Sequence, residues 1–253
     1  TEYYQERFVS LDVAFKDKMI KIEELNEHFR DEEKQKLLHN YLTYYNIKAN
    51  ISNYVEDALC KDLLLLRIFS EANQGKTLGH VHSIKREELF AEYYELMTLR
   101  LIEKVQNELH YRLEKSSISS FMENMVNYMI SNDSFFNVPL PQLLKNIAIE
   151  EKEIFKRFLD ENILLRKDLA PAAKGAFSHN EVVNFTYDSF RDYIISAYLS
   201  DSILPRNFSE YERSVRIFTS SGHQLREGIT PFLFVHSKNN QQRNACNVLS
   251  QLD

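Results

Sequence analysis

The stretch 182–199, VVNFTYDSFRDYIISAYL, constrains the fold more than any other part of the sequence, because its hydrophobic period changes partway along. From Val183 to Tyr187 apolar and polar residues alternate, which predicts a half-buried strand. Asp188 then lies where the N-cap of a helix is expected. The apolar positions that follow share one helical face: Phe190, Tyr193, Ile194, Ala197 and Tyr198. The stretch therefore predicts a strand that leads directly into an amphipathic helix.

Two polar side chains, Tyr187 and Arg191, lie at this junction. A helix N-terminus has free backbone N–H groups and favours anions, so we interpret both residues as candidates for contact with a nucleotide phosphate held by another domain. The alternative is that Tyr187 is a core aromatic residue that closes the strand, since buried tyrosines are common and usually find a hydrogen-bond partner.

The composition favours a mainly α-helical protein. The 253 residues include only five glycines and five prolines, and helices need few turn residues. No run approaches the roughly 18 apolar residues that cross a bilayer, so we expect a soluble protein without a membrane partner. The two cysteines, Cys60 and Cys246, have no paired spacing, which fits a reducing compartment and predicts a cytoplasmic location.

Hydrophobic periodicity predicts a helical domain over residues 31–115. Helices are expected over 31–46, 52–73 and 85–114, with a loop at 75–83. The run LLLLRIF in the second helix is dense enough to predict burial on all sides. Tyr93, Met97, Leu101, Val105, Leu109 and Leu113 recur every four residues along the third helix. That helix is long enough to bridge two domains, at about 1.5 Å rise per residue.

Residues 116–204 predict a winged-helix domain, composed of three helices and a β-hairpin. The helices are expected at 121–130, from Pro141 onward, and at 151–161, and the strands at 163–165 and 182–187. Ser120 and Glu123 have the spacing of a capping box. Asn162 is suited to the left-handed conformation that ends a helix. Further helices are expected over 205–253, as the start of a second helical or sensor domain.

A winged helix first raises the possibility of DNA binding. In DNA-binding versions the third helix enters the major groove and needs basic and amide side chains. Here residues 150–161 contain five acids (Glu150, Glu151, Glu153, Asp160, Glu161) and three bases (Lys152, Lys156, Arg157). Because phosphate neutralisation dominates the affinity for DNA, and the whole chain carries a net charge of −6, these charges argue against DNA.

No catalytic or metal-binding constellation is evident. The tripeptide GKT at 75–77 lacks the earlier glycine of a phosphate-binding loop, whose place is taken by Ser70. His80 and His82 have no third ligand nearby, so we interpret them as solvated histidines. We therefore expect no catalysis, metal or cofactor binding by this chain alone.

Three segments resemble the signal-transduction ATPases with numerous domains (STAND NTPases, including the NACHT group), especially the bacterial antiviral members. TEYYQERF at 1–8 resembles the segment after their sensor-one strand, so residues 1–30 would be the C-terminal end of an NTPase domain. KDLLLLRIF at 61–69 is similar to a motif of their first helical domain. FTYDSFRDYIISAYL at 185–199 resembles the end of their winged helix and is the most specific of the three.

The resemblance implies that the chain is part of a longer protein, whose ATPase domain binds ATP or ADP with Mg²⁺. The winged helix and the helical domain would clasp that nucleotide. Tyr187 takes the place of a histidine that touches the ADP phosphate in many relatives, and Leu63 takes the place of a proline near the adenine. The chain itself contains no Walker motif.

The family also implies partners and a pathway. A C-terminal sensor recognises a foreign protein, such as a phage protein, and ATP-bound subunits then form a homo-oligomer that activates an N-terminal effector. The predicted function is thus a regulatory module of an antiviral STAND ATPase. The alternatives are a winged-helix transcriptional regulator that binds DNA and a scaffold that uses its winged helix for protein contacts.

Overall fold

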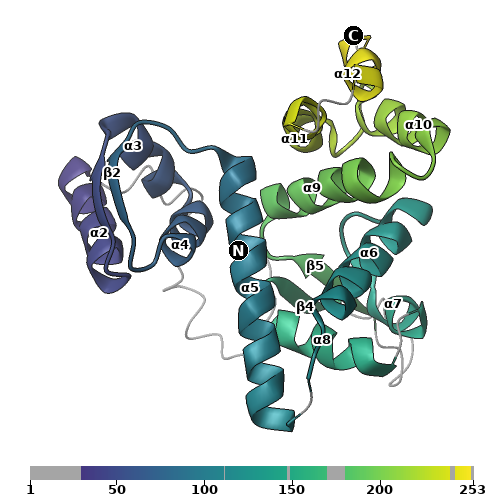
Figure 1. Cartoon of the computed structure of the whole chain (residues 1–253), viewed down its shortest axis with the longest axis horizontal. Coiled ribbons are helices and arrows are strands. Elements are labelled where there is room, and N and C mark those ends of the chain that lie inside the picture. The colour runs from purple at the N-terminus through teal and green to yellow at the C-terminus, as the bar shows by residue number, and fades with distance from the viewer. Residues whose placement is uncertain (1–29, 111, 147–148, 170–179, 240–242, 252–253) are drawn as a thin grey trace, which may run out of the picture. The chain divides into compact units, whose positions relative to one another are not determined.

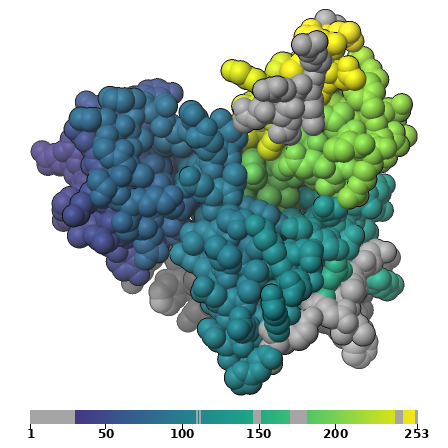
Figure 2. Space-filling view, viewed as in Figure 1, coloured from purple at the N-terminus to yellow at the C-terminus, as the bar shows by residue number. Residues whose placement is uncertain are grey.

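The chain divides between Lys85 and Arg86 into two units, and helices dominate both. Figure 1 shows the computed structural model as a ribbon, and Figure 2 shows the same view with all side chains. The structure describes residues 30–110, 112–146, 149–169, 180–239 and 243–251. The segment 1–30, expected to end an NTPase domain, lies outside these ranges except for Arg30.

The first unit contains three helices and two strands. The helices are α2 (Asp31–Tyr44), α3 (Asn53–Lys61) and α4 (Leu63–Ala72), and the strands are β1 (Lys48–Ile51) and β2 (Thr77–Val81). The two strands pair in parallel, with α3 and α4 in the crossover between them. The core of the unit consists mainly of aliphatic side chains from α3 and α4: Val55, Leu59, Leu65, Leu66 and Ile68.

Three predictions for this unit were wrong. The segment 75–83 was expected to be a loop, but it contains β2, which is held by its pairing with β1. The expected helix over 52–73 is interrupted at Asp62, whose backbone is extended and whose carboxylate accepts a hydrogen bond from the Leu65 N–H at 3.0 Å. The LLLLRIF run that follows is amphipathic, because Leu64 is 36% exposed.

Helix α5 (Arg86–Leu109) belongs to the second unit, although the sequence placed these residues in the first helical domain. Its predicted four-residue periodicity is confirmed over most of its length. Tyr93, Met97, Leu101 and Val105 are each no more than 5% exposed. They form the face that α5 contributes to the core of this unit.

A three-stranded antiparallel sheet lies near the centre of the second unit. Its strands are β3 (Val138–Pro139), β4 (Leu164–Leu169) and β5 (Asn180–Phe185), in the order β3-β5-β4. Leu164 is opposite Phe185 in the β4–β5 pair, and both side chains are buried. The pairing of β4 and β5 was expected, whereas β3 was not.

Three helices precede this pair of strands: α6 (Lys115–Ser131), α7 (Leu140–Asn146) and α8 (Ile149–Asp160). Phe121 of α6 stacks on Phe158 of α8 with 5.4 Å between ring centroids, and both rings are fully buried. This contact fixes α6 against α8.

The start of α6 differs from the prediction. The helix begins at Lys115, so Ser120 and Glu123 lie inside it and do not form a capping box. Glu123 instead accepts a hydrogen bond from the Ser202 hydroxyl at 3.0 Å. The left-handed conformation expected for Asn162, after α8, is confirmed by its φ of 56°.

The remaining helices follow β5. Helix α9 (Asp188–Ala197) continues into the π-helix η3 (Tyr198–Ile203), and α10 (Phe208–Phe218), α11 (Arg226–Asn239) and α12 (Arg243–Ser250) complete the unit. In Figure 1 the last three helices lie together beyond α9, away from α8. The helical structure expected after residue 205 is therefore present. No helix in the described part of the chain combines the length and apolarity that a membrane span requires.

The N-caps of α3 and α4 provide a matched test of this fold. The Asp62 carboxylate caps α4, whereas the buried Ser52 hydroxyl at the start of α3 has no hydrogen-bond partner among the described residues. Asp62→Ala should therefore lower the stability of the first unit by about 1 kcal/mol. Ser52→Ala should change it by a few tenths of a kcal/mol at most, since it removes an unsatisfied hydroxyl.

Amide hydrogen exchange in α3 and α4, measured for both variants, separates the two effects. Equal acceleration of exchange in the two variants would contradict this assignment of the caps.

Candidate functional site

The candidate site lies where β5 passes into α9. Strand β5 ends at Phe185, and Tyr187 is the N-cap of α9. The N–H groups of Phe190 and Arg191 donate to the Tyr187 carbonyl, each at 3.1 Å. Asp188, expected to be the N-cap, is instead the first residue of the helix, and the Tyr187 side chain makes no capping hydrogen bond.

Tyr187 is half-buried against α5. Its ring packs edge-to-face on Phe90, with 5.7 Å between centroids and an interplanar angle of 84°. Phe90 is fully buried and also contacts Phe190, Tyr193 and Phe232. One face of the Tyr187 ring is thus fixed by the core of the second unit. The interpretation of Tyr187 as a packing aromatic residue accounts for this ring contact, whereas the contact with a nucleotide stays a prediction.

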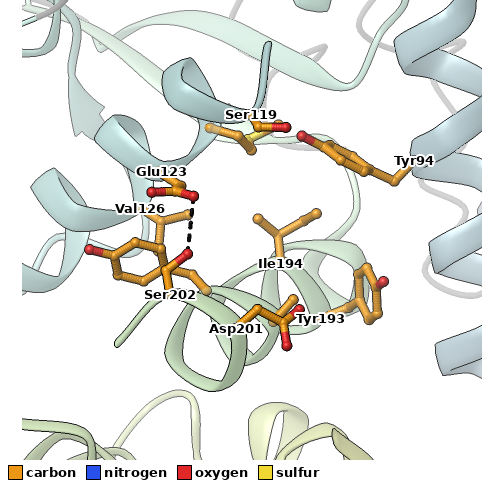
Figure 3. Close-up of a pocket in the computed structure, with 11 residues that line it drawn as sticks. Tyr94, Ser119, Glu123, Val126, Tyr193, Ile194, Asp201 and Ser202 are labelled. Carbon is orange, nitrogen blue, oxygen red and sulfur yellow. Dashed lines mark hydrogen bonds between the residues drawn. The ribbon is translucent and has the colours of Figure 1, made fainter. Parts of the chain in front are cut away.

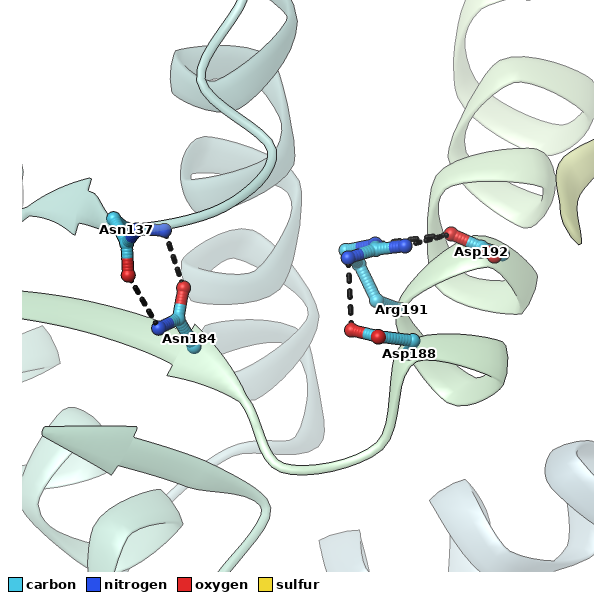
Figure 4. Close-up of polar contacts among 5 residues, drawn as sticks. All are labelled: Asn137, Asn184, Asp188, Arg191 and Asp192. Atoms are coloured by element: carbon cyan, nitrogen blue, oxygen red, sulfur yellow. Dashed lines mark hydrogen bonds and ion pairs between the residues drawn. The ribbon is translucent and has the colours of Figure 1, made fainter. Parts of the chain in front are cut away.

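Arg191 is the most constrained residue of the site, because it is only 3% exposed. Its Nε and Nη2 donate to Asp192 Oδ1 at 2.9 and 2.8 Å, and its Nη1 donates to Asp188 Oδ1 at 2.9 Å (Figure 4). The guanidinium also lies 4.1 Å from the centroid of the Phe136 ring, within the range of a cation–π contact. These contacts satisfy the charge of Arg191 inside the protein.

Asp192 is the buried partner in this cluster, at 5% exposure. Burial raises the pKa of its carboxyl, while the Arg191 guanidinium beside it acts in the opposite direction. The side chain lies directly against α11: a Cβ added to Gly228 would be 1.8 Å from Asp192 Oδ2 and 2.8 Å from its Cγ. The absence of a side chain at Gly228 is what lets α9 approach α11 at this point.

One arginine and two carboxylates give this cluster no excess positive charge. Arg191 was expected as a guanidinium near a helix N-terminus that could contact a phosphate, but the structure places it in the interior, bonded to Asp188 and Asp192. Asp188, Asp192 and Phe136 were not anticipated as its partners. The spacing of Asp188 and Arg191, three residues apart on a helix, is the signal that would have indicated the first of these contacts.

Two asparagines, Asn137 and Asn184, hold strand β5 beside the site. The Asn137 N–H donates to Asn184 Oδ1, and Asn184 Nδ2 donates to Asn137 Oδ1 at 3.0 Å. Figure 4 shows this reciprocal pair on β5 and on the residue just before β3. Asn137 has a φ of 54°, a conformation that asparagine tolerates better than most residues. The pair fixes the segment that carries Phe136 toward Arg191.

The third predicted site residue, Leu63, lies in the first unit. It is the first residue of α4, directly after the Asp62 cap, and is half-buried. Tyr187 and Arg191 are therefore brought together at one helix N-terminus, whereas Leu63 belongs to a separate part of the structure.

The other motifs form no site. Gly75 has a positive φ and Thr77 begins a strand, whereas a phosphate-binding loop leads into a helix. The His80 and His82 rings are exposed and stack with 5.8 Å between centroids. Among the described residues, no group of three or more His, Cys, Asp or Glu side chains is placed to hold a metal ion.

Comparison of the sequence with protein families and curated proteins assigns no family to this chain. No protein-family model matches the chain, and no curated protein does either. The site is therefore interpreted from its own residues.

Gly228→Ala tests the close approach of α9 and α11. Alanine is usually favoured over glycine within a helix by about 1 kcal/mol, but here its Cβ would collide with the Asp192 carboxylate. We expect the variant to lose about 1–3 kcal/mol of unfolding free energy, as in other overpacked cores.

The Asp192→Ala background is the control for this prediction. With the carboxylate removed, the Gly228→Ala change should be neutral or stabilising by up to about 1 kcal/mol. The same loss in both backgrounds, measured by chemical denaturation, would show that the contact is not the cause.

Two half-buried histidines in the second unit predict a pH-dependent stability. Burial lowers the pKa of His236 and of His223, although nearby carboxylates act in the opposite direction. The unfolded chain therefore takes up protons first as the pH falls through about 6.5. The unfolding free energy should be at its full value above about pH 7 and decrease below it, by at most about 1.4 kcal/mol per pH unit per histidine.

Denaturation curves between about pH 7.5 and 5.5 measure this slope. The double variant His223→Gln/His236→Gln should flatten it, whereas substitution of the exposed His39 by Gln should leave it unchanged. An unaltered slope in the double variant would exclude these two histidines as its source.

Proposed function

We propose that this chain is a regulatory module of a STAND-type ATPase, in which a winged helix and a helical domain respond to the nucleotide held by an ATPase domain of the same protein. The observation that carries the proposal is the order of elements from α6 to β5, followed directly by α9. The order is helix, strand, helix, helix, strand, strand, with the last strand in the middle of the sheet. This order supports the proposal of a winged helix.

The position of Tyr187 supports this proposal. It is the N-cap residue of the helix that follows the last strand, where the related ATPases place the residue that touches the ADP phosphate. Its ring is held on Phe90 and its backbone carbonyl begins α9, so the direction of its side chain is well determined. A tyrosine at the N-cap position of a helix is suited to contact with a phosphate.

Arg191 has a different role in this proposal from Tyr187. Because Asp188, Asp192 and Phe136 already hold its guanidinium, we assign it as a positioning residue that orients the first turn of α9. Leu63, at the start of α4, would pack near the adenine in place of the usual proline.

The division into two units fits a regulatory role. A nucleotide shared between domains changes their relative position only if it binds one arrangement more tightly than the other. We infer that ADP favours the resting arrangement. Exchange for ATP with Mg²⁺, triggered when a sensor binds a foreign (phage) protein in the cytoplasm, would then permit homo-oligomerisation and activation of an effector. In this scheme the chain contributes regulation, while catalysis resides in the ATPase domain.

DNA binding is less well supported. Arg157, one of three bases in the third helix of the winged helix, is only 7% exposed. It is bound by Glu108 at 2.6 Å and Glu153 at 2.8 Å. Only Lys152 and Lys156 remain as exposed bases on α8, too few for the phosphate contacts on which duplex affinity depends.

Tyr187→Phe in the complete parent protein tests the proposal, because it removes the hydroxyl and keeps the ring on Phe90. A lost hydrogen bond to a charged phosphate, at about 1.5 kcal/mol, should speed ADP release about tenfold and raise activity in the absence of the trigger. Stopped-flow release of a fluorescent ADP analogue measures the first effect.

Tyr128→Phe is the matched control, since Tyr128 is a half-buried tyrosine of α6 outside the site. It should leave ADP release unchanged. Unchanged release and unchanged basal activity in Tyr187→Phe would remove this hydroxyl from the mechanism.

A further inference from the structure

A pocket of about 210 Å³ opens among α5, α6, α9 and η3, all within the second unit (Figure 3). It is separate from the Arg191 cluster and none of the residues discussed for the nucleotide lines it. Helix α9 presents Ile194 to the middle of the pocket, Tyr94 enters from α5, and Glu123 enters from α6.

The π-helix η3 contributes polar residues to this pocket. The apolar face of α9 runs through Tyr193, Ile194 and Ala197, and the next turn of the same face would be expected to stay apolar. It carries Asp201 and Ser202 instead. Asp201 is exposed and the Ser202 hydroxyl donates to Glu123 at 3.0 Å, so this turn gives the pocket a carboxylate and a hydroxyl in place of apolar groups.

The lining of the pocket combines three aromatic rings with two carboxylates. The rings are those of Tyr94, Tyr193 and Tyr198, and the carboxylates are those of Glu123 and Asp201. Burial is the main cause that raises the pKa of all three tyrosines, in the case of Tyr193 to about 12, so their hydroxyls are neutral at physiological pH. No lysine, arginine or histidine lines the pocket.

These features select the charge of a ligand. The two carboxylates give a negative potential that disfavours anions. The described residues contain no set of three His, Cys, Asp or Glu side chains placed to hold a metal ion, and this pocket offers such an ion only two carboxylates. The faces of tyrosine rings attract an ammonium group within about 6 Å of their centroids.

We propose that this pocket binds an alkylammonium group, with the rings of Tyr94 and Tyr198 around its carbon atoms and Glu123 and Asp201 as counter-charges. The volume lies below the range of about 300–1,000 Å³ typical of drug-sized ligands, so the occupant is one ammonium head with a few carbon atoms. Such a group occurs in a free amine and at the end of a lysine side chain. The proposal is independent of the nucleotide function, because it involves neither Tyr187 nor Leu63.

Binding to the 253-residue chain is tested by nuclear magnetic resonance with labelled methionine and isoleucine methyl groups. Met122 and Ile194 line the pocket, whereas Met97 lies in the core of α5 outside it and serves as the internal control. The probes are choline, butylammonium, blocked lysine and dimethylbutanol, the uncharged carbon isostere of choline.

We expect an ammonium probe to shift the Met122 and Ile194 signals saturably and leave Met97 unchanged. Dimethylbutanol should bind at least about tenfold more weakly than choline. Tighter binding of blocked lysine than of choline and butylammonium would identify a lysine side chain of a protein as the source of the bound ammonium group. Tighter binding of choline or butylammonium would identify a free amine. Equal binding of choline and dimethylbutanol, or no shift with any ammonium probe, would overturn the proposal.

Charge-neutralising variants complete the test. Glu123→Gln/Asp201→Asn should weaken choline binding by at least about tenfold. The control Glu103→Gln/Asp168→Asn neutralises two exposed carboxylates outside the pocket and should leave binding unchanged. Equal losses in both double variants would overturn the proposal.

The unsubstituted chain supplies the same test if the first double variant does not fold. Raising the salt concentration to about 0.5 M should weaken choline binding several-fold and leave dimethylbutanol unaffected. Binding of choline that is insensitive to salt would also overturn the proposal.

Discussion

The aromatic cluster around Phe90 is the interaction on which the second unit depends. Phe90 is fully buried on α5, and its ring lies 5.7–5.8 Å from the rings of Tyr187, Phe190, Tyr193 and Phe232. These partners come from the N-terminus of α9, from its body and from α11. Because edge-to-face aromatic pairs have preferred geometries, one side chain fixes three helices together with the residue proposed to meet the nucleotide.

The ion pair beside this cluster contributes orientation more than stability. Buried ion pairs are often no more stabilising than apolar residues of the same volume, but the loss of one partner leaves an uncompensated charge. Arg191 and Asp192 are neighbours on α9, so their pair moves with the helix, but Asp192 lies against Gly228 and Arg191 lies on Phe136 only if α9 keeps one rotation about its axis. The pair therefore specifies how α9 packs.

Sequence periodicity correctly predicted the buried residues where a single helix buries one of its faces. The buried positions of α5 are such a case, whereas α9 was expected to bury one stripe and is buried at every residue from Phe190 to Ser196. The pairing of β1 with β2 was missed because it joins short segments that are distant in sequence and carry no strong alternation. The burial of Arg191 was missed for a related reason: only the three-dimensional structure brings Phe136 and Gly228 to it.

The π-helical turn after α9 determines how the chain leaves that helix. The Leu204 N–H bonds to the Leu199 carbonyl, five residues back, at 2.9 Å. A turn of this kind contains one residue more than an α-turn, and each residue of a helix corresponds to a rotation of about 100°. A chain shortened by one residue between 198 and 203 would regain regular helix, but everything after it would point in another direction. The number of residues in this segment is therefore as much a requirement of the fold as their chemistry.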